Sequence, residues 1–195
     1  SKVTWIGSKP TGKHDGAIPV VEGTISVEDG TITAGSFSMD IANITIADIE
    51  EDTEEYGKLK GHLLSEDFFA AEEYPTATFE ITAITSFDST VINTKEEYET
   101  DFAPASGNEH IVTNPTHNIS GNLTMRGATK NITFPANVSI SGDKITAKAK
   151  FNIDRTDWKL MYGDEASVTD KAKDKFIYNT VNVGFEIEAS SQATL

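Results

Sequence analysis

The chain has 195 residues and a formal net charge of −15, with 31 acidic against 16 basic residues and no cysteine. This charge argues against binding to nucleic acid or to anionic lipid surfaces, both of which need a basic footprint. The absence of cysteine excludes disulfides, thiolate zinc sites and cysteine nucleophiles, and no apolar run approaches the roughly 18 residues that a membrane span needs. The length suits a single domain over residues 1–195 with a substantial core.

Alternation of apolar and polar residues runs through most of the chain and predicts strands, because successive side chains of a strand point to opposite faces. The clearest case is a hairpin over residues 119–140, whose turn contains Gly127. The predicted strands, in chain order, are residues 3–9, 18–28, 31–41, 76–84, 119–126, 130–140, 144–155 and 180–189. Residues 10–16, rich in glycine and carrying His14, are expected to form a loop.

Helical periodicity appears once, over residues 52–64, where Tyr56, Leu59 and Leu63 fall at helical spacing after a candidate cap at Thr53. A second short helix is expected to begin at residues 65–67. Pro75 ends this helical insertion, because the residue before a proline avoids helical backbone. Residues 86–117 mix charges with proline and glycine, and we expect an excursion there with at most one added strand pair.

About eight alternating strands with one short helical insertion predict an all-β protein, an antiparallel β-barrel whose closure removes exposed strand edges. A barrel of this size is either filled by its own side chains or holds one small ligand. The inferred inner faces carry small residues among large aliphatic and aromatic ones, namely Gly23, Gly35, Ala77, Gly121, Ala136, Ala147 and Ala149. Two alternatives stay open: an apolar cavity, or a core in which small and large side chains interdigitate.

No catalytic constellation is evident, and we expect neither catalytic residues nor a metal site. The four histidines lie in no zinc-binding pattern, and no serine sits in a nucleophile elbow. His14 is either a loop histidine bonded to backbone or a contact for a ligand headgroup at the barrel mouth. Arg155 follows Ile153 by two residues and is therefore expected on the inner face, where a buried arginine needs backbone carbonyls or a polar headgroup as its partner.

Four short motifs occur in order along the chain. They are W-x-G-x-K-x-x-G-x-H-x-G from Trp5 to Gly16, Asp67-Phe68-Phe69 followed by Tyr74-Pro75-Thr76-Ala77-Thr78-Phe79, G-x-L-T-x-x-G-x-T-K from Gly121 to Lys130, and Phe151, Ile153, Arg155 and Asp157-Trp158. As an ordered set they resemble the YceI-like family of polyisoprenoid-binding proteins. The resemblance covers nearly the whole chain except residues 86–117.

The resemblance implies a lipocalin-like antiparallel barrel, usually in the bacterial periplasm, with a long isoprenoid chain threaded into an apolar cavity. A quinone-like or polyprenyl lipid is the implied ligand, and a homodimer is a further expectation. The chain starts at Ser1 without an initiator methionine, and we expect an exported protein whose leader was removed. Two departures from the family stand out. The longer 86–117 segment leaves open the form of the barrel mouth or the dimer face, and residues 159–162, where the family often has glycine, leave open the loop over one end of the cavity.

The inner faces and the resemblance together predict a set of ligand contacts. The predicted cavity-lining residues are Trp5, Val21, Ile25, Phe37, Met39, Phe79, Ile81, Leu123, Met125, Phe134, Ala147, Ala149, Phe151 and Phe185. The candidate headgroup contacts are His14 and Arg155. We expect the protein to bind a long-chain apolar lipid for transport, storage or sequestration, with no other cofactor. The alternatives are an enzyme acting on such a lipid in the same cavity and an interaction protein whose barrel is solidly packed.

Overall fold

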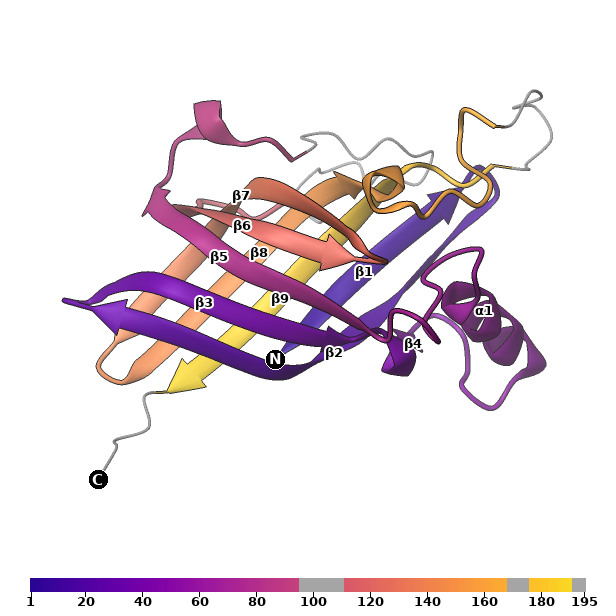
Figure 1. The fold of residues 1–195 in the computed structure, drawn as a ribbon, viewed down its shortest axis with the longest axis horizontal. Coiled ribbons are helices and arrows are strands. Elements are labelled where there is room, and N and C mark those ends of the chain that lie inside the picture. The colour runs from indigo at the N-terminus through magenta and orange to yellow at the C-terminus, as the bar shows by residue number, and fades with distance from the viewer. Residues whose placement is uncertain (95–110, 168–175, 191–195) are drawn as a thin grey trace.

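A closed antiparallel barrel of eight strands forms the body of the protein (Figure 1). The computed structural model describes residues 1–94, 111–167 and 176–190. Its strands are β1 (Lys2–Lys9), β2 (Gly12–Glu28), β3 (Thr31–Asp40), β4 (Thr45–Ile46), β5 (Thr76–Ser86), β6 (His117–Met125), β7 (Ala128–Ser141), β8 (Lys144–Asp154) and β9 (Thr180–Ser190). The order around the barrel is β1-β9-β8-β7-β6-β5-β3-β2, the pairing of β1 with β2 closes it, and β4 adds a short ninth strand beside β2. The predicted all-β, lipocalin-like architecture is confirmed.

The first hairpin is longer than the sequence predicts. The prediction of a loop over residues 10–16 is wrong, because β2 begins at Gly12. The first part of β2 pairs with the whole of β1, from Gly12 opposite Lys9 to Pro19 opposite Lys2. Gly16 allows close approach of neighbouring atoms instead of a loop. A Cβ atom on Gly16 would lie 1.9 Å from the carbonyl oxygen of Thr45 and 2.9 Å from the Trp5 ring. His14 therefore sits on a strand, opposite Gly7.

Three irregularities in strand pairing change which side chains face inward. The pairing of β2 with β3 shifts between Val20 and Glu22 and again between Ser26 and Val27, and that of β5 with β6 shifts between Ile81 and Ala83. Each shift inserts one extra residue, which reverses the alternation on the far side of the bulge. The prediction that Val21 faces inward is therefore wrong: Val21 is 61% exposed, and Val20 packs against the core instead.

The helical insertion contains one α-helix, α1 (Glu54–Leu64), in the part of the chain that the structure describes. The predicted cap is confirmed, since the Thr53 hydroxyl accepts the Tyr56 N–H at 3.2 Å, and two glutamates occupy the first turn, as the helix dipole favours. The second helix predicted from residues 65–67 is absent, because residues 66–73 form turns in this region. In Figure 1, α1 lies beside β4 at one end of the barrel.

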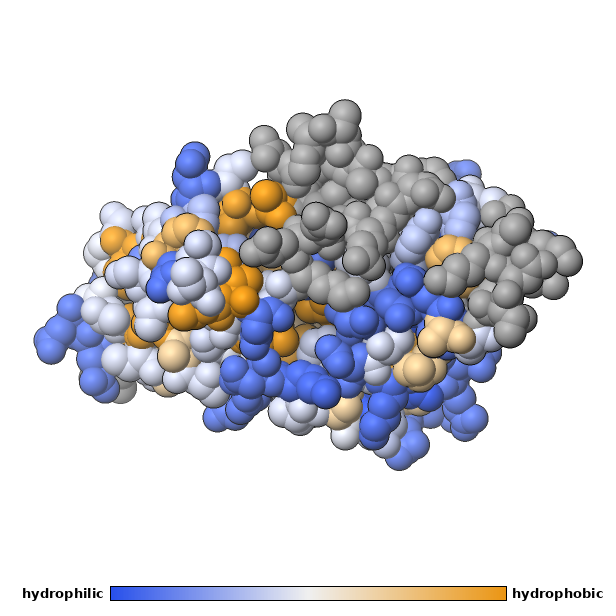
Figure 2. Space-filling model, turned by 90° about the horizontal axis from the view of Figure 1, so that it is seen from above, coloured by the Kyte–Doolittle hydropathy of each residue, from blue (hydrophilic) through white to orange (hydrophobic). Residues whose placement is uncertain are grey.

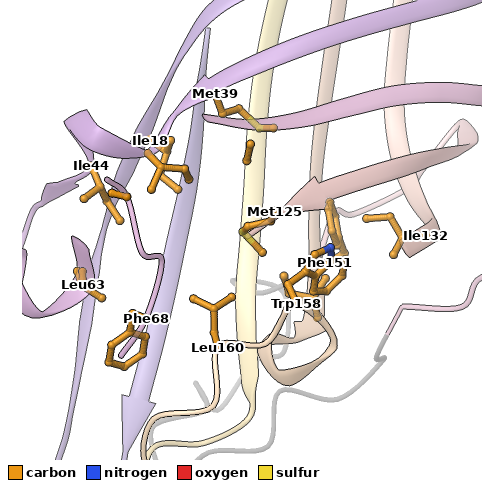
Figure 3. Packing of buried hydrophobic residues seen from close by; sticks show 14 of the residues in the cluster. Ile18, Met39, Ile44, Leu63, Phe68, Met125, Ile132, Phe151, Trp158 and Leu160 are labelled. Carbon is orange, nitrogen blue, oxygen red and sulfur yellow. The ribbon is translucent and has the colours of Figure 1, made fainter. Parts of the chain in front are cut away.

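Buried side chains from the strands, from α1 and from the segment after β8 converge inside the barrel (Figure 3). Trp158 is only 1% exposed and fixes the segment after β8 to the barrel, because its Nε1–H donates to the Leu123 carbonyl at 2.9 Å.

Hydrophilic residues cover much of the outer face seen in Figure 2, with hydrophobic residues gathered in smaller areas. Between β5 and β6, where the sequence predicts an excursion, the structure shows a 3-10 turn at Ser89–Val91. Residues 95–110 of this segment, where an added strand pair is expected at most, lie outside the described residues.

Candidate functional site

A cavity of about 720 Å³ occupies the interior of the barrel. All eight barrel strands contribute to its wall, together with α1 and the segments around Phe68, Leu160 and Phe176. Most lining side chains are aliphatic or aromatic. Along β8 the wall runs from Ala147 to Ile153, six residue steps, and Arg155 in the 3-10 turn after the strand continues it. At roughly 3.3 Å per residue, the β8 part alone corresponds to about 20 Å. The space is therefore long, apolar and of a size typical of ligand sites.

The structure places most of the predicted contacts on this wall. The predicted residues that line the cavity are Trp5, Ile25, Phe37, Met39, Phe79, Ile81, Leu123, Met125, Phe134, Ala147, Phe151 and Phe185, joined by His14 and Arg155. Val21 lies outside, as the bulge in β2 requires. Ala149 is 2% exposed and belongs to the core, but it is not part of the cavity wall.

The position of Ala149 follows from the phenylalanines around it. Its strand neighbours in register are Ala136 and Phe185. The rings of Phe134 and Phe151 stack with centroids 4.1 Å apart, and the Phe185 ring meets Phe134 edge-on at 5.5 Å. Ala149 and Ala136 are thus small residues next to a packed aromatic group, and the cavity begins beyond those rings.

Gly121 shows the same relation more sharply. A Cβ atom on Gly121 would lie 2.2 Å from the ring of Phe79, so only glycine lets that ring cross β6. From the sequence, small inward residues could mean either empty space or interdigitation with large side chains. At Gly121 the space is instead filled by an aromatic side chain from the neighbouring strand, and the Phe79 ring presents the cavity surface.

The cavity reaches solvent at the end of the barrel where α1 lies. Tyr162 both lines the cavity and exposes 47% of its surface. The His62 ring packs edge-on against Tyr162, with centroids 4.4 Å apart, and against Phe68 at 5.1 Å. These three rings belong to α1, to the turns that follow it and to the segment after β8. We call them the aromatic rim, and they join three separate segments at the cavity mouth.

His14 is held by Asp48 at the same end. Its Nδ1 lies 2.8 Å from Asp48 Oδ2, while the other carboxylate oxygen accepts the Asp15 N–H at 3.1 Å. Partial burial acts to raise the pKa of Asp48, but the hydrogen bonds from His14 and Asp15 and the charge of His14 outweigh it and lower the pKa below its ordinary value. The carboxylate fixes the imidazole in one orientation, with Nε2 left for another partner.

Arg155 is 4% exposed and donates to three backbone carbonyls. Its Nε donates to Tyr178 at 3.1 Å, one Nη donates to Ile177 at 2.9 Å, and the other donates to Leu160. The guanidinium also lies 5.8 Å from the centre of the Phe68 ring. Burial lowers the pKa of Arg155, and the charges of Asp164, Asp154 and Glu165 act in the opposite direction. Arg155 therefore ties the end of β8 to the segments on either side of the cavity mouth while keeping its charge.

Several lining residues were not predicted. His62, Leu59 and Leu63 enter from α1, and Tyr162 and Phe176 enter from the segment between β8 and β9. A signal for His62 existed, because it follows Leu59 by three residues and so shares the apolar face of the helix. The segment between β8 and β9 has no periodic pattern that could have revealed its contribution.

Three further observations concern metal sites, membrane spans and unpaired polar atoms. In the described residues, no group of three or more histidines and carboxylates comes together as a metal site. None of the helices in the described ranges is long and apolar enough to cross a membrane. The Nε1 atom of Trp5 is buried without a hydrogen-bond partner in the described part of the chain, although other atoms of this residue line the cavity.

Comparison with known proteins shows which family and which solved structures this chain resembles. A family model described as a YceI-like domain matches residues 1–189, whereas no curated protein sequence matches the chain. BcnA of Burkholderia cenocepacia is similar in structure, with a TM-score of 0.63 and 18% identity over 97% of this chain and 96% of that one. A polyisoprenoid binding domain from Saccharophagus degradans, implicated in plant cell wall breakdown, gives a TM-score of 0.60 and 16% identity over 98% and 94% of the two chains.

A YCEI protein of Campylobacter jejuni is also similar, with a TM-score of 0.53 and 18% identity over 90% of this chain and 84% of the other. At these identities the structural likenesses show the fold alone. The family model, in contrast, spans nearly the whole chain, and the chain therefore belongs to the YceI-like family.

Proposed function

We propose that this protein binds a long apolar lipid of the polyisoprenoid class inside its barrel and acts as a carrier, store or scavenger of that lipid. The observation that carries the proposal is the cavity of about 720 Å³, which has hydrocarbon-like walls along the barrel and polar side chains only near one end. Burying an apolar chain there gains about 0.8 kcal/mol for each CH₂ group removed from water. The likeness to a polyisoprenoid binding domain supports an isoprenoid over other apolar chains.

Binding without catalysis is the reading that the site supports best. The His14–Asp48 pair has the geometry of a base and its orienting carboxylate, with Nδ1 and Oδ2 2.8 Å apart. Catalysis would also require a nucleophile or a second acid within hydrogen-bond reach of the reacting atom. No carboxylate lines the cavity in the described ranges, and its polar side chains gather at the mouth. This arrangement suits the orientation of a headgroup.

The experiment is a chain-length series. Protein freed of lipid on a hydrophobic resin is titrated with prenyl alcohols of ten, fifteen and twenty carbons, which differ only in the length of the apolar chain. We expect affinity to rise steeply with each added isoprene unit, because each unit buries further apolar surface. Equal affinity for all three alcohols would mean that the chain stays outside the barrel and would overturn the proposal.

Solvent extraction of the purified protein, followed by mass spectrometry of the extract, identifies the natural ligand. We expect a polyisoprenoid in stoichiometric amount. Phospholipids or fatty acids in its place would contradict the isoprenoid assignment while leaving lipid binding intact.

A further inference from the structure

The charge of the cavity wall is opposite to that of the whole protein. The chain carries 31 acidic and 16 basic residues. In the ranges that the structure describes, however, the ionisable groups on the wall, apart from the Tyr162 phenol, are all basic: Lys9, His14, His62 and Arg155. All four lie at the mouth, because the end of β1, the start of β2, the end of β8 and α1 meet there. Because acidic residues outnumber basic ones in the chain as a whole, a wall whose charged groups are all basic is not expected from composition alone.

The carboxylates near the cavity mouth bind other protein groups and do not line the cavity. Asp48 is bonded to His14, Asp67 lies 3.3 Å from Nε2 of His62, and Asp164 accepts hydrogen bonds from Ser167 and from the Ala166 N–H. None of the three lines the cavity. Asp48 and Asp67 hold the two histidines in place, and the remaining cationic side chains on the wall are Lys9 and Arg155.

Lys9 and Arg155 both line the cavity, and neither has an ion-pair partner among the described residues. Arg155 binds the Tyr178 carbonyl, and the Tyr178 N–H donates to the carbonyl of Ser8, the residue before Lys9, at 2.9 Å. The guanidinium has five N–H groups, and within the described part of the chain three of them donate to backbone carbonyls and two have no recorded acceptor. The charges of Asp164, Asp154 and Glu165 act on Arg155, but its burial outweighs them and lowers its pKa, so the buried cation is still costly. An anion brought within reach of the guanidinium offsets that cost.

We propose that the mouth of the cavity receives an anionic oxygen headgroup, a carboxylate or a phosphate, with Lys9 and Arg155 as its cationic partners. This inference rests on the proposed lipid-binding function and specifies the headgroup that function selects. The apolar chain supplies most of the affinity, and the headgroup decides between lipids with the same chain. His14 and His62, each oriented by its aspartate, flank the headgroup position.

The test compares three lipids that share one twenty-carbon prenyl chain and end in an alcohol, a carboxylate or a monophosphate. Lipid-free protein is titrated with each at neutral pH and low salt. We expect the two anionic lipids to bind at least about tenfold more tightly than the alcohol, since hydrogen bonds to charged groups contribute about 1.5–3 kcal/mol. The relative affinity of the carboxylate and the monophosphate identifies which source of anionic oxygen the mouth prefers.

Two matched variants assign the preference to the mouth. Lys9→Gln removes a cation from the cavity wall, whereas Lys13→Gln removes the same charge from the same hairpin at an exposed position off the wall. We expect Lys9→Gln to lower affinity for the anionic lipids several-fold and to leave the alcohol unchanged, while Lys13→Gln changes neither. Both lysines are exposed, so folding is preserved in each variant.

Each failure has a distinct meaning. If the alcohol binds as tightly as the anionic lipids, the headgroup inference is overturned and the proposed lipid-binding function stands. If the two lysine variants behave alike, the assignment to Lys9 is wrong. If none of the three lipids binds, the proposed function itself fails and the inference fails with it.

Discussion

Arg155 is both a buried structural residue and a charged group on the cavity wall. Its three hydrogen bonds to backbone carbonyls connect the end of β8 to residues 160 and 177–178, which border the cavity mouth. The sequence placed Arg155 on the inner face and left two partners open, carbonyls or a headgroup. The structure supplies the carbonyls, and the unused N–H groups leave room for the second partner as well.

Replacing Arg155 by methionine should therefore destabilise the fold. Each buried carbonyl that loses its donor costs about 1–3 kcal/mol, so three of them predict a loss of at least about 3 kcal/mol in the free energy of unfolding. Arg126→Met is the matched control, since the half-buried Arg126 also donates to two carbonyls, of Lys159 and Glu66, but in solvent-exposed hydrogen bonds where water can replace it. Urea unfolding of both variants gives the comparison, and equal losses would contradict the structural role assigned to Arg155.

Asp48 gives a second prediction at the residue scale, in its dependence on pH. Its pKa is lower in the folded chain than in the unfolded chain, so the stabilisation it provides is present above pH about 4 and disappears as the pH falls through the folded pKa. Asp48→Asn should be less stable than the parent protein at pH 7, by no more than about 1 kcal/mol because the side chain is partly exposed. At pH 3 or below the difference should shrink towards zero. A difference that stays constant from pH 7 to pH 2.5 would show that the carboxylate charge is not responsible.

At the scale of the elements, α1 covers the cavity mouth with Leu59, His62 and Leu63 on one face. The helix is short and contains two glycines, so its cap matters for its stability. Thr53 accepts the Tyr56 N–H through its hydroxyl and donates that hydroxyl to the Glu50 carbonyl at 2.6 Å. Loss of the cap should loosen the cover before it affects the barrel.

Thr53→Ala should cost about 1 kcal/mol, whereas Thr53→Ser retains the hydroxyl and should cost much less. Hydrogen exchange of the α1 amides should accelerate in the alanine variant, with the β8 and β9 amides unchanged, because the helix opens locally. Dissociation of a prenyl alcohol should become faster in the same variant. If the serine and alanine variants exchange alike, the cap does not control the cover.

The sequence predicts the strands and the apolar face of α1, because both depend on local periodicity. In β6 the alternation from Ile119 to Met125 matches the inner face throughout. In β2 the same reasoning fails at Val21, because a bulge depends on how β2 and β3 meet and leaves no mark in the local pattern. The loop predicted for residues 10–16 is wrong for a related reason. Glycine is compatible with a loop, but Gly16 instead permits the close approach of Thr45 and Trp5 within a strand.

At the scale of the whole molecule, the position of the cavity depends on where large side chains from one strand fill the space beside small residues of the next. Small inward residues could indicate empty space from the sequence, yet Gly121 lies against the Phe79 ring and Ala149 lies beside the packed phenylalanines. The sequence cannot make this distinction, because it depends on neighbours far away in the chain. Ala147, two residues from Ala149 on the same strand face, does line the cavity.

These two alanines form a matched pair for testing the cavity. Ala149→Trp should overpack the core and cost at least about 1–3 kcal/mol. Ala147→Trp should place its indole in the cavity and leave the free energy of unfolding nearly unchanged. Both must be measured on lipid-free protein, since a bound ligand raises apparent stability. Similar losses in the two variants would indicate a solid core around both positions.

The most direct measurement of the central claim is native mass spectrometry of lipid-free protein incubated with a twenty-carbon prenyl alcohol. The parent protein should bind one lipid per chain, and Ala147→Trp, although folded, should bind little or none. Thr24→Trp, on the polar and exposed side of β2, is the control for the added indole and should bind as the parent does. Full lipid occupancy of a folded Ala147→Trp protein would place the lipid outside the barrel and contradict the account.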